Sequence, residues 1–242
     1  MRTRDDPAAE RRRLLLLGCL LARRLAPGAV VAGPAAAWAQ LLGEAPSKLA
    51  ADRSVFRSSG LVTADDQPVT RQTRIVNGST LRTGRDSELV FVVGSAALLM
   101  RADTQLSVQG PTPGGAPESI KLGQGKLLAV FAPGPRAIQT PTAAIRISGT
   151  GVYIEADPAL TYFCTCYGRT EVSAVNDPGS VEQVLSRHHD KPLYIEGGGR
   201  NRGRSIRRAP FINHTDDELA LIETLVGRTP PFIHGKPNYQ RP

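Results

Sequence analysis

Short apolar runs alternate with turn residues between positions 74 and 175, and this rhythm constrains the fold more than any other feature of the chain. Runs such as 88–93 and 126–131 are rich in Val, Leu and Phe, residue types that suit a pleated, half-buried strand. Glycine corners such as Gly78 and Gly84 separate the runs. They recur every 8–12 residues or so, roughly the spacing found in sandwiches and barrels. The region predicts an all-β fold, a multi-stranded sandwich or a solenoid-like roll.

The composition agrees with short strands and weighs against a nucleic-acid partner. Glycine occurs 24 times and proline 19 times, whereas aromatic residues make up 5% of the chain. Abundant turn formers favour many short strands over a few long helices. The formal charge is +8, but residues 1–39 contain seven arginines and three acidic residues, so half of the basic excess lies there. We therefore expect no nucleic-acid partner.

Residues 1–39 have the layout of an export signal. Arg11–Arg13 precede an apolar run, a second apolar run follows Arg23-Arg24, and the segment ends in a small-x-small pattern at Ala39. A basic start, an apolar middle and a small-residue end are typical of a secretory signal, and the paired arginines are compatible with a Tat-like route. We expect a periplasmic protein, cleaved near Ala39, with no membrane span in the mature chain. A lipid anchor at Cys19 and a cytoplasmic location are the alternatives.

The rest of the chain divides into three parts. Residues 40–71 are mixed and polar and predict a mature N-terminal arm, and residues 72–176 form the β domain. Residues 177–242 predict a loop-rich tail with a short helix at 181–188 and a second helix near 216–226. The second helix is the better defined, because a capping box opens it and Gly227 ends it.

Four segments of the β domain follow the pattern of a known family. They are residues 77–87, 120–127, 140–153 and 168–172. In this order they resemble the FecR domain, the periplasmic domain of ferric-citrate-type regulators. The residues that carry the signature are Gly84, Thr140, Pro141, Gly149, Thr150 and Gly168. They are fold-specifying residues. The glycines allow corners with positive φ, and the Thr-Pro and Gly-Thr pairs fix the direction of the turns.

The resemblance implies a periplasmic module that binds or senses. Members of the family commonly pass an outer-membrane transport signal, such as ferric citrate uptake, to a sigma factor. The signalling members carry an anti-sigma segment and a membrane helix before the β domain, which 39 residues cannot supply. We therefore expect a stand-alone exported form whose partner is another envelope protein, in signalling or in regulation related to iron uptake.

Cys164 and Cys166 form the most unusual pattern in the chain. Alternation along a strand places both side chains on one face, about 6.6 Å apart at ~3.3 Å per residue. Two thiolates can share one tetrahedral ion, and His188, His189 and His214 are candidates to complete the site. Soft sulfur ligands suit Zn or Cu(I), so a metal or haem carrier is one hypothesis. Buried packing of two small side chains and a strained disulfide are the others.

A second candidate site is an arginine-rich loop after three consecutive glycines. Its residues are Arg200, Arg202, Arg204, Arg207 and Arg208. Such a cluster could bind a polyanion through phosphate groups, although no aromatic residue interleaves it to stack on bases. A solvated loop is the alternative.

No catalytic pattern stands out. The Gly-Ser pairs at 78–79 and 94–95 do not lie in a G-x-S-x-G elbow, and the glycines at 197–199 do not lead from a strand into a helix as a phosphate loop does. We expect a protein that is not an enzyme.

Overall fold

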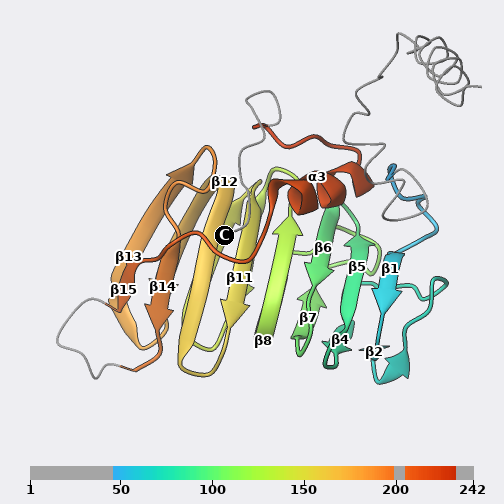
Figure 1. The fold of residues 1–242 in the computed structure, drawn as a ribbon, viewed down its shortest axis with the longest axis horizontal. Coiled ribbons are helices and arrows are strands. Elements are labelled where there is room, and N and C mark those ends of the chain that lie inside the picture. The colour runs from blue at the N-terminus through green and yellow to red at the C-terminus, as the bar shows by residue number, and fades with distance from the viewer. Residues whose placement is uncertain (1–45, 199–204, 233–242) are drawn as a thin grey trace, which may run out of the picture. The chain divides into compact units, whose positions relative to one another are not determined.

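The computed structural model describes residues 46–198 and 205–232, and these residues form an all-β body with one short helix near its C-terminal end (Figure 1). The predicted fold class is therefore confirmed. The strands are β1 (Val55–Ser59), β2 (Val62–Ala64), β3 (Gln67–Pro68), β4 (Thr80–Thr83), β5 (Glu88–Val93), β6 (Ala96–Met100), β7 (Gln105–Gln109), β8 (Ser119–Val130), β9 (Pro135–Gln139), β10 (Ala143–Ser148), β11 (Gly151–Ala156), β12 (Leu160–Ala174), β13 (Asp177–Ser186), β14 (Leu193–Glu196) and β15 (Ile206–Arg208).

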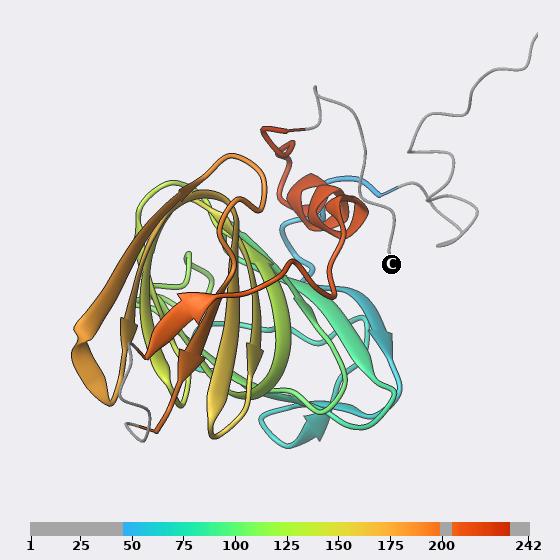
Figure 2. The ribbon, with the colours of Figure 1, turned by 60° about the vertical axis from the view of Figure 1, so that its left-hand side comes forward.

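The strands form two layers that share their two longest members. Sheet A has the order β1-β5-β6-β8-β11-β12-β14-β15, and sheet B has the order β3-β2-β4-β7-β8-β9-β10-β12-β13. All pairings between the described strands are antiparallel except β8 with β9, which is parallel. The apolar core lies between the layers (Figure 2) and contains Leu89 and Phe91 of sheet A with Leu106 and Val172 of sheet B.

Glycines mark the points where the two long strands pass from one sheet to the other. Strand β8 pairs with β7 as far as Gln124 and with β11 from Gly125 onward. Strand β12 pairs with β11 as far as Tyr167 and with β13 from Gly168 onward. Gly125 and Gly168 have φ of +96° and +92°, a region that side chains rarely allow. Gly168, expected as a signature residue, therefore sits at a bend that joins the sheets.

The other signature residues also lie at corners. Gly149, with φ of +66°, turns the chain between β10 and β11, immediately before Thr150. Gly84 packs on Leu61, to whose carbonyl it donates a hydrogen bond. Each of these residues lies where the backbone changes direction.

The Thr140-Pro141 corner is built around buried hydroxyl groups. Thr140 Oγ1 accepts a hydrogen bond from the Ala143 amide at 2.9 Å and lies 2.8 Å from Thr161 Oγ1. Thr142 Oγ1 donates to Thr161 Oγ1 and lies 2.9 Å from the Ile195 carbonyl oxygen. The turn after β9 is thereby tied to β12 and β14.

Two predicted boundaries need correction. Residues 55–68, expected within an N-terminal arm, form β1, β2 and β3. Strand β1 pairs with β5, and β2 pairs with both β4 and β3. Residues 181–188, expected as a helix, lie mostly in β13, which forms a hairpin with β12. Both segments lie at sheet edges. Edge strands are partly exposed and often polar, so their sequences show little of the apolar alternation of a strand. The β body therefore extends well into the expected tail.

Helix α3 (Asp216–Leu225) packs on the outer face of sheet A, outside the two-layer body (Figure 2). Thr215 is its N-cap and forms the predicted capping box with Glu218. Leu219, Ile222 and Leu225 are buried against the sheet. The helix near 216–226 is confirmed. Among the described residues, no helix has the length and hydrophobicity needed to cross a bilayer.

Candidate metal centre

Cys164 and Cys166 lie on the outer face of β12, beneath the C-terminal segment. Strand alternation turns Phe163 into the core between the sheets and leaves both cysteines in the apolar layer that α3 covers. Both thiols are free and fully buried. The prediction that the two side chains share one face is confirmed.

Two histidines reach the cysteines from other parts of the chain. His189 follows β13 with φ of +55°, and its backbone N–H donates to the Cys166 carbonyl at 2.9 Å. His214 lies immediately before the N-cap of α3. Their exposed fractions are 6% and 3%. The β12–β13 hairpin therefore positions one imidazole and the start of the helix positions the other.

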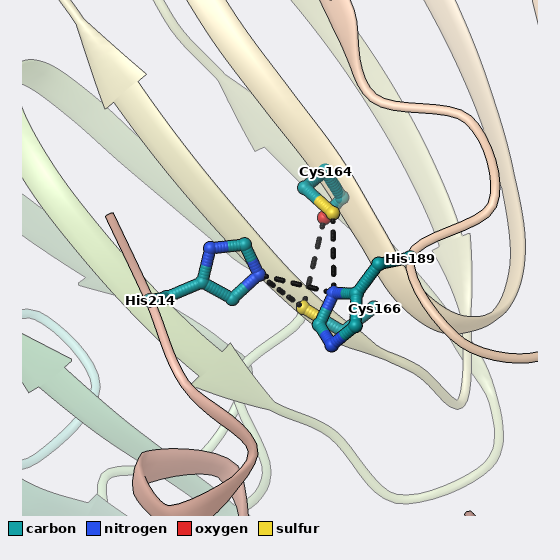
Figure 3. A group of neighbouring side chains, drawn as sticks. All are labelled: Cys164, Cys166, His189 and His214. Atoms are coloured by element: carbon teal, nitrogen blue, oxygen red, sulfur yellow. Dashed lines mark hydrogen bonds between the residues drawn. The ribbon is translucent and has the colours of Figure 1, made fainter. Parts of the chain in front are cut away.

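The four side chains converge on one point (Figure 3). His189 Nδ1 lies 3.4 Å from Cys164 Sγ, and His214 Nε2 lies 3.4 Å from Cys166 Sγ. The two ring nitrogens are 3.1 Å apart, and all four atoms lie within 4.8 Å of one another. Bond lengths of about 2.0–2.1 Å for Zn–N and about 2.3 Å for Zn–S separate the atoms of a tetrahedral site by about 3.3–3.8 Å. The two sulfur–nitrogen distances of 3.4 Å and the nitrogen–nitrogen distance of 3.1 Å lie near the lower end of this range.

Hydrogen bonds outside the cluster fix which nitrogen of each imidazole faces the other ligands. His214 Nδ1 lies 2.8 Å from the Ile212 carbonyl oxygen, to which it donates, so Nε2 faces the cluster. His189 Nε2 lies 3.1 Å from Asp216 Oδ1, so Nδ1 is the nitrogen directed at the cysteines. Metal-bound histidines are oriented by such partners, a carboxylate or a backbone carbonyl on the other ring nitrogen. Both rings are therefore arranged as metal ligands.

The cluster favours a thiolate at Cys164. Burial opposes ionisation, but hydrogen bonds from Cys166, His189 and His214 hold the pKa of the Cys164 thiol well below its ordinary value. Burial and the neighbouring Cys164 raise the pKa of the Cys166 thiol. Burial acts to lower the pKa of His189, yet Asp216 and Cys164 raise it. One negative charge is therefore already stabilised where a cation would bind.

His188, the fifth candidate ligand, lies outside the group of four. Its Nε2 atom is 2.9 Å from both carboxylate oxygens of Asp216, and its side chain is 33% exposed. Asp216 thus contacts both His188 and His189, and it was assigned in the sequence only to the helix cap. The only sign of this role in the sequence is that Asp216 follows the candidate ligand His214 by two positions.

Aromatic rings surround the imidazoles. The Tyr153 ring stacks on His214 with centroids 4.4 Å apart. The centroid of the Phe211 ring lies 4.5 Å from the ring centroids of both His189 and His214. These contacts restrict the rings and keep the cluster in an apolar environment, which strengthens electrostatic attraction to a bound cation.

The arginine cluster is only partly described. Arg207 pairs with Glu196 at 3.0 Å and its guanidinium lies 4.4 Å from the centroid of the Tyr194 ring. Arg208 is exposed on β15. Arg200, Arg202 and Arg204 lie outside the described residues. Arg207 is therefore engaged within the β14–β15 hairpin, and polyanion binding by the arginine cluster stays a prediction.

The fold and the four-residue cluster define an all-β module with a candidate Cys₂His₂ metal centre. No protein-family model and no curated protein matches the sequence. Two crystal structures of a candidate anti-sigma factor from Parabacteroides distasonis ATCC 8503 are similar in fold. Each has a TM-score of 0.43, with 12% and 13% identity over 54% of this chain and 58% of the other. The match thus spans little more than half of either protein.

Proposed function

We propose that this chain is a metal-binding β module that holds one zinc ion through Cys164, Cys166, His189 and His214. The observation that carries the proposal is the convergence of one nitrogen of each imidazole and both thiol sulfurs within 4.8 Å in a buried layer. Two lone pairs facing each other at 3.1 Å repel unless a proton or a cation lies between them. A cation satisfies all four groups at once.

The donor set favours zinc and leaves Cu(I) as its competitor. Tetrahedral sites with two sulfur and two nitrogen ligands are typical of zinc, and thiolates also suit Cu(I). Four protein ligands occupy every position of a tetrahedral ion, which is the arrangement of structural and not of hydrolytic zinc sites. We therefore propose a binding role without catalysis. Ligand atoms this close suit a single ion better than a haem.

Metal analysis of the purified full chain tests the proposal. We expect about one zinc per chain, and Co²⁺ in its place should give the absorption of a tetrahedral thiolate site. Cys166→Ser and His214→Gln should each lose stoichiometric metal. His188→Gln is the control, because His188 contributes no atom to the group of four although its ring lies beside that of His189, and it should keep about one ion. A wild-type chain that binds neither Zn²⁺ nor Cu⁺ would overturn the proposal. Binding of Cu⁺ in preference to Zn²⁺ would change the ion and keep the site.

We also propose that the module works outside the cytoplasm, as a sensing or binding component whose partner is an envelope protein. Support comes from the leader-like pattern of residues 1–39 and from the FecR-like signature glycines, which lie at bends of the backbone. Cell fractionation combined with capture of periplasmic partners tests this role. A chain retained whole in the cytoplasm would contradict it.

A further inference from the structure

Three consecutive residues join the candidate metal centre to the beginning of α3. His214 supplies a ligand atom, Thr215 caps the helix, and Asp216 accepts the hydrogen bond that orients His189. We propose that metal binding and docking of the C-terminal segment, residues 209–232, are coupled, so that loss of the ion loosens this segment from sheet A. This inference rests on the proposed function and assigns a means of regulation to the same site.

The ion would connect two separate parts of the fold. Cys164 is fixed opposite Tyr153 by the pairing of β12 with β11, and Cys166 lies two residues further along β12, where the register of that pairing shifts. His189 is held to β12 by its backbone hydrogen bond. His214 alone among the four comes from the C-terminal segment (Figure 3). The Asp216–His189 contact is a second connection between the segment and the β body. A bound ion therefore acts as a cross-link at the start of α3.

Removing the ion takes away the one group that binds all four side chains at once. What then joins His214 to the β body at this site is its contacts of 3.1 Å with His189 and 3.4 Å with Cys166. The strand pairing resists movement of the cysteines. His214 is the group that can move most easily, because it lies on a connection between β15 and α3. Its departure also disturbs the neighbouring cap and the Asp216 contact.

The surface under the segment gives this coupling a consequence. Leu219, Ile222 and Leu225 of α3 are buried in one cluster with side chains from sheet A. The sheet residues of that cluster are Val90, Ala97, Leu99, Leu128, Val130, Tyr153, Tyr162, Cys164, Cys166 and Tyr167. An apolar patch of this kind, when uncovered, is a surface for association. In the metal-bound form α3 covers this patch of sheet A, so loss of the metal would uncover the patch.

Contacts that involve no candidate ligand atom allow the coupling to be measured from the other side. Leu225 is buried at the C-terminal end of α3, and Arg101 donates to Glu218 at 2.7 Å. Neither belongs to the candidate ligand set. If docking and metal binding are linked, each strengthens the other by the same factor. Weakening the docking of α3 therefore lowers the affinity for the metal, by up to that factor. A site without coupling has no reason to respond to these positions.

Hydrogen exchange of the full chain, with zinc and after chelation, tests the inference. Amides of α3 should exchange at least about 5-fold faster after chelation, the lower end of usual coupling factors, while β5 and β6 serve as the internal reference. Leu225→Ala should weaken zinc binding by about 5-fold or more, whereas Leu185→Ala, at a side chain 70% exposed on β13, should leave it unchanged. Arg101→Met provides a second variant that does not open the core, and it should weaken zinc binding in the same direction.

The outcomes separate the two proposals. If zinc binds stoichiometrically but α3 exchanges equally with and without it, and both docking variants keep wild-type affinity, the coupling is wrong and the metal site stands. If no metal binds to the wild-type chain, the metal site and the coupling fail together. Faster exchange of α3 on chelation, together with weaker zinc binding in the docking variants, supports both.

Discussion

His189 Nδ1 lies 3.1 Å from His214 Nε2, although the two residues are 25 positions apart and belong to different elements. The other nitrogen of each ring already has a hydrogen-bond acceptor, Asp216 for His189 and the Ile212 carbonyl for His214. The rings are therefore directed at each other by their outer partners, and the thiols of Cys164 and Cys166 lie at 3.4 Å from them. This relationship is what distinguishes a ligand cluster from ordinary core packing.

Asp216→Asn should lower zinc affinity by about 10–100-fold, the usual effect of losing an outer-sphere partner, while about one ion still binds. The carboxylate strengthens the basicity of His189 and fixes its tautomer, and an amide does so less well. The measurement is competition for zinc against a chelator of known affinity.

Asp217→Asn is the matched control for this change. Asp217 also lies in the first turn of α3, so its loss has the same effect on the helix dipole. It is exposed and belongs to no group of candidate ligands. Equal losses of affinity in the two variants would show that the helix dipole, and not the contact with His189, is responsible.

The β body could be predicted from the sequence because strand alternation and glycine corners are local signals. The same alternation placed Cys164 and Cys166 on one face. The choice between His188 and His189 could not be made, because it depends on the positive φ of His189 and on the register of the β12–β13 hairpin. The position of His214 depends on the path between β14 and α3, for which no local pattern exists.

The error at 181–188 has a physical cause. Val181, Val184 and Leu185 have the spacing of one helix face, yet in β13 Val184 points into the core while Val181 and Leu185 are 47% and 70% exposed. Pairing with the long β12 outweighs the helical pattern, as tertiary contacts often outweigh local preference. Asp216 was missed for a related reason, since the capping box already accounted for its charge.

Thr142→Val should reduce the free energy of unfolding by about 1–3 kcal/mol, the usual result of leaving a buried polar group without its partner. The substitution keeps the shape of the side chain but removes the hydroxyl that contacts Thr161 and the Ile195 carbonyl. Urea denaturation measures the change. Thr112→Val, at an exposed residue, should stay within about 0.5 kcal/mol of the wild type, and a similar result for both would argue against the hydroxyl network.

Gly168→Ala should destabilise the fold by at least about 1 kcal/mol, because strained backbone conformations carry penalties of about 1–3 kcal/mol. The residue has φ of +92°, and an added Cβ would lie 2.5 Å from Thr150 Cγ2. The bend in β12 would have to shift. Urea denaturation of Gly114→Ala supplies the comparison, since a Cβ at Gly114 meets no atom within 4 Å. Unchanged stability in Gly168→Ala would remove the proposed role of this bend.

Processing of the N-terminal segment is a prediction from residues 1–39. The mature protein should begin near Gln40, which intact-mass measurement and N-terminal sequencing determine. Ala39→Leu should block cleavage, because export signals require small residues at the cleavage site, and the longer form should accumulate. A wild-type protein that keeps all of residues 1–39 would favour the cytoplasmic alternative, and one that begins at Cys19 would favour the lipid anchor.

Zinc removal should lower thermal stability in the wild type and have no effect in Cys166→Ser. A ligand that binds only the folded state adds about 2.7 kcal/mol when its free concentration is 100 times Kd, so the midpoint of unfolding should rise with added zinc and fall on chelation. Mg²⁺ is the control ion, because it prefers oxygen ligands in octahedral geometry and should not restore the midpoint. Since Cys166→Ser removes one sulfur from the cluster, its midpoint should already lie near that of the chelated wild type. A variant that still responds to zinc as the wild type does would place the ion elsewhere in the chain.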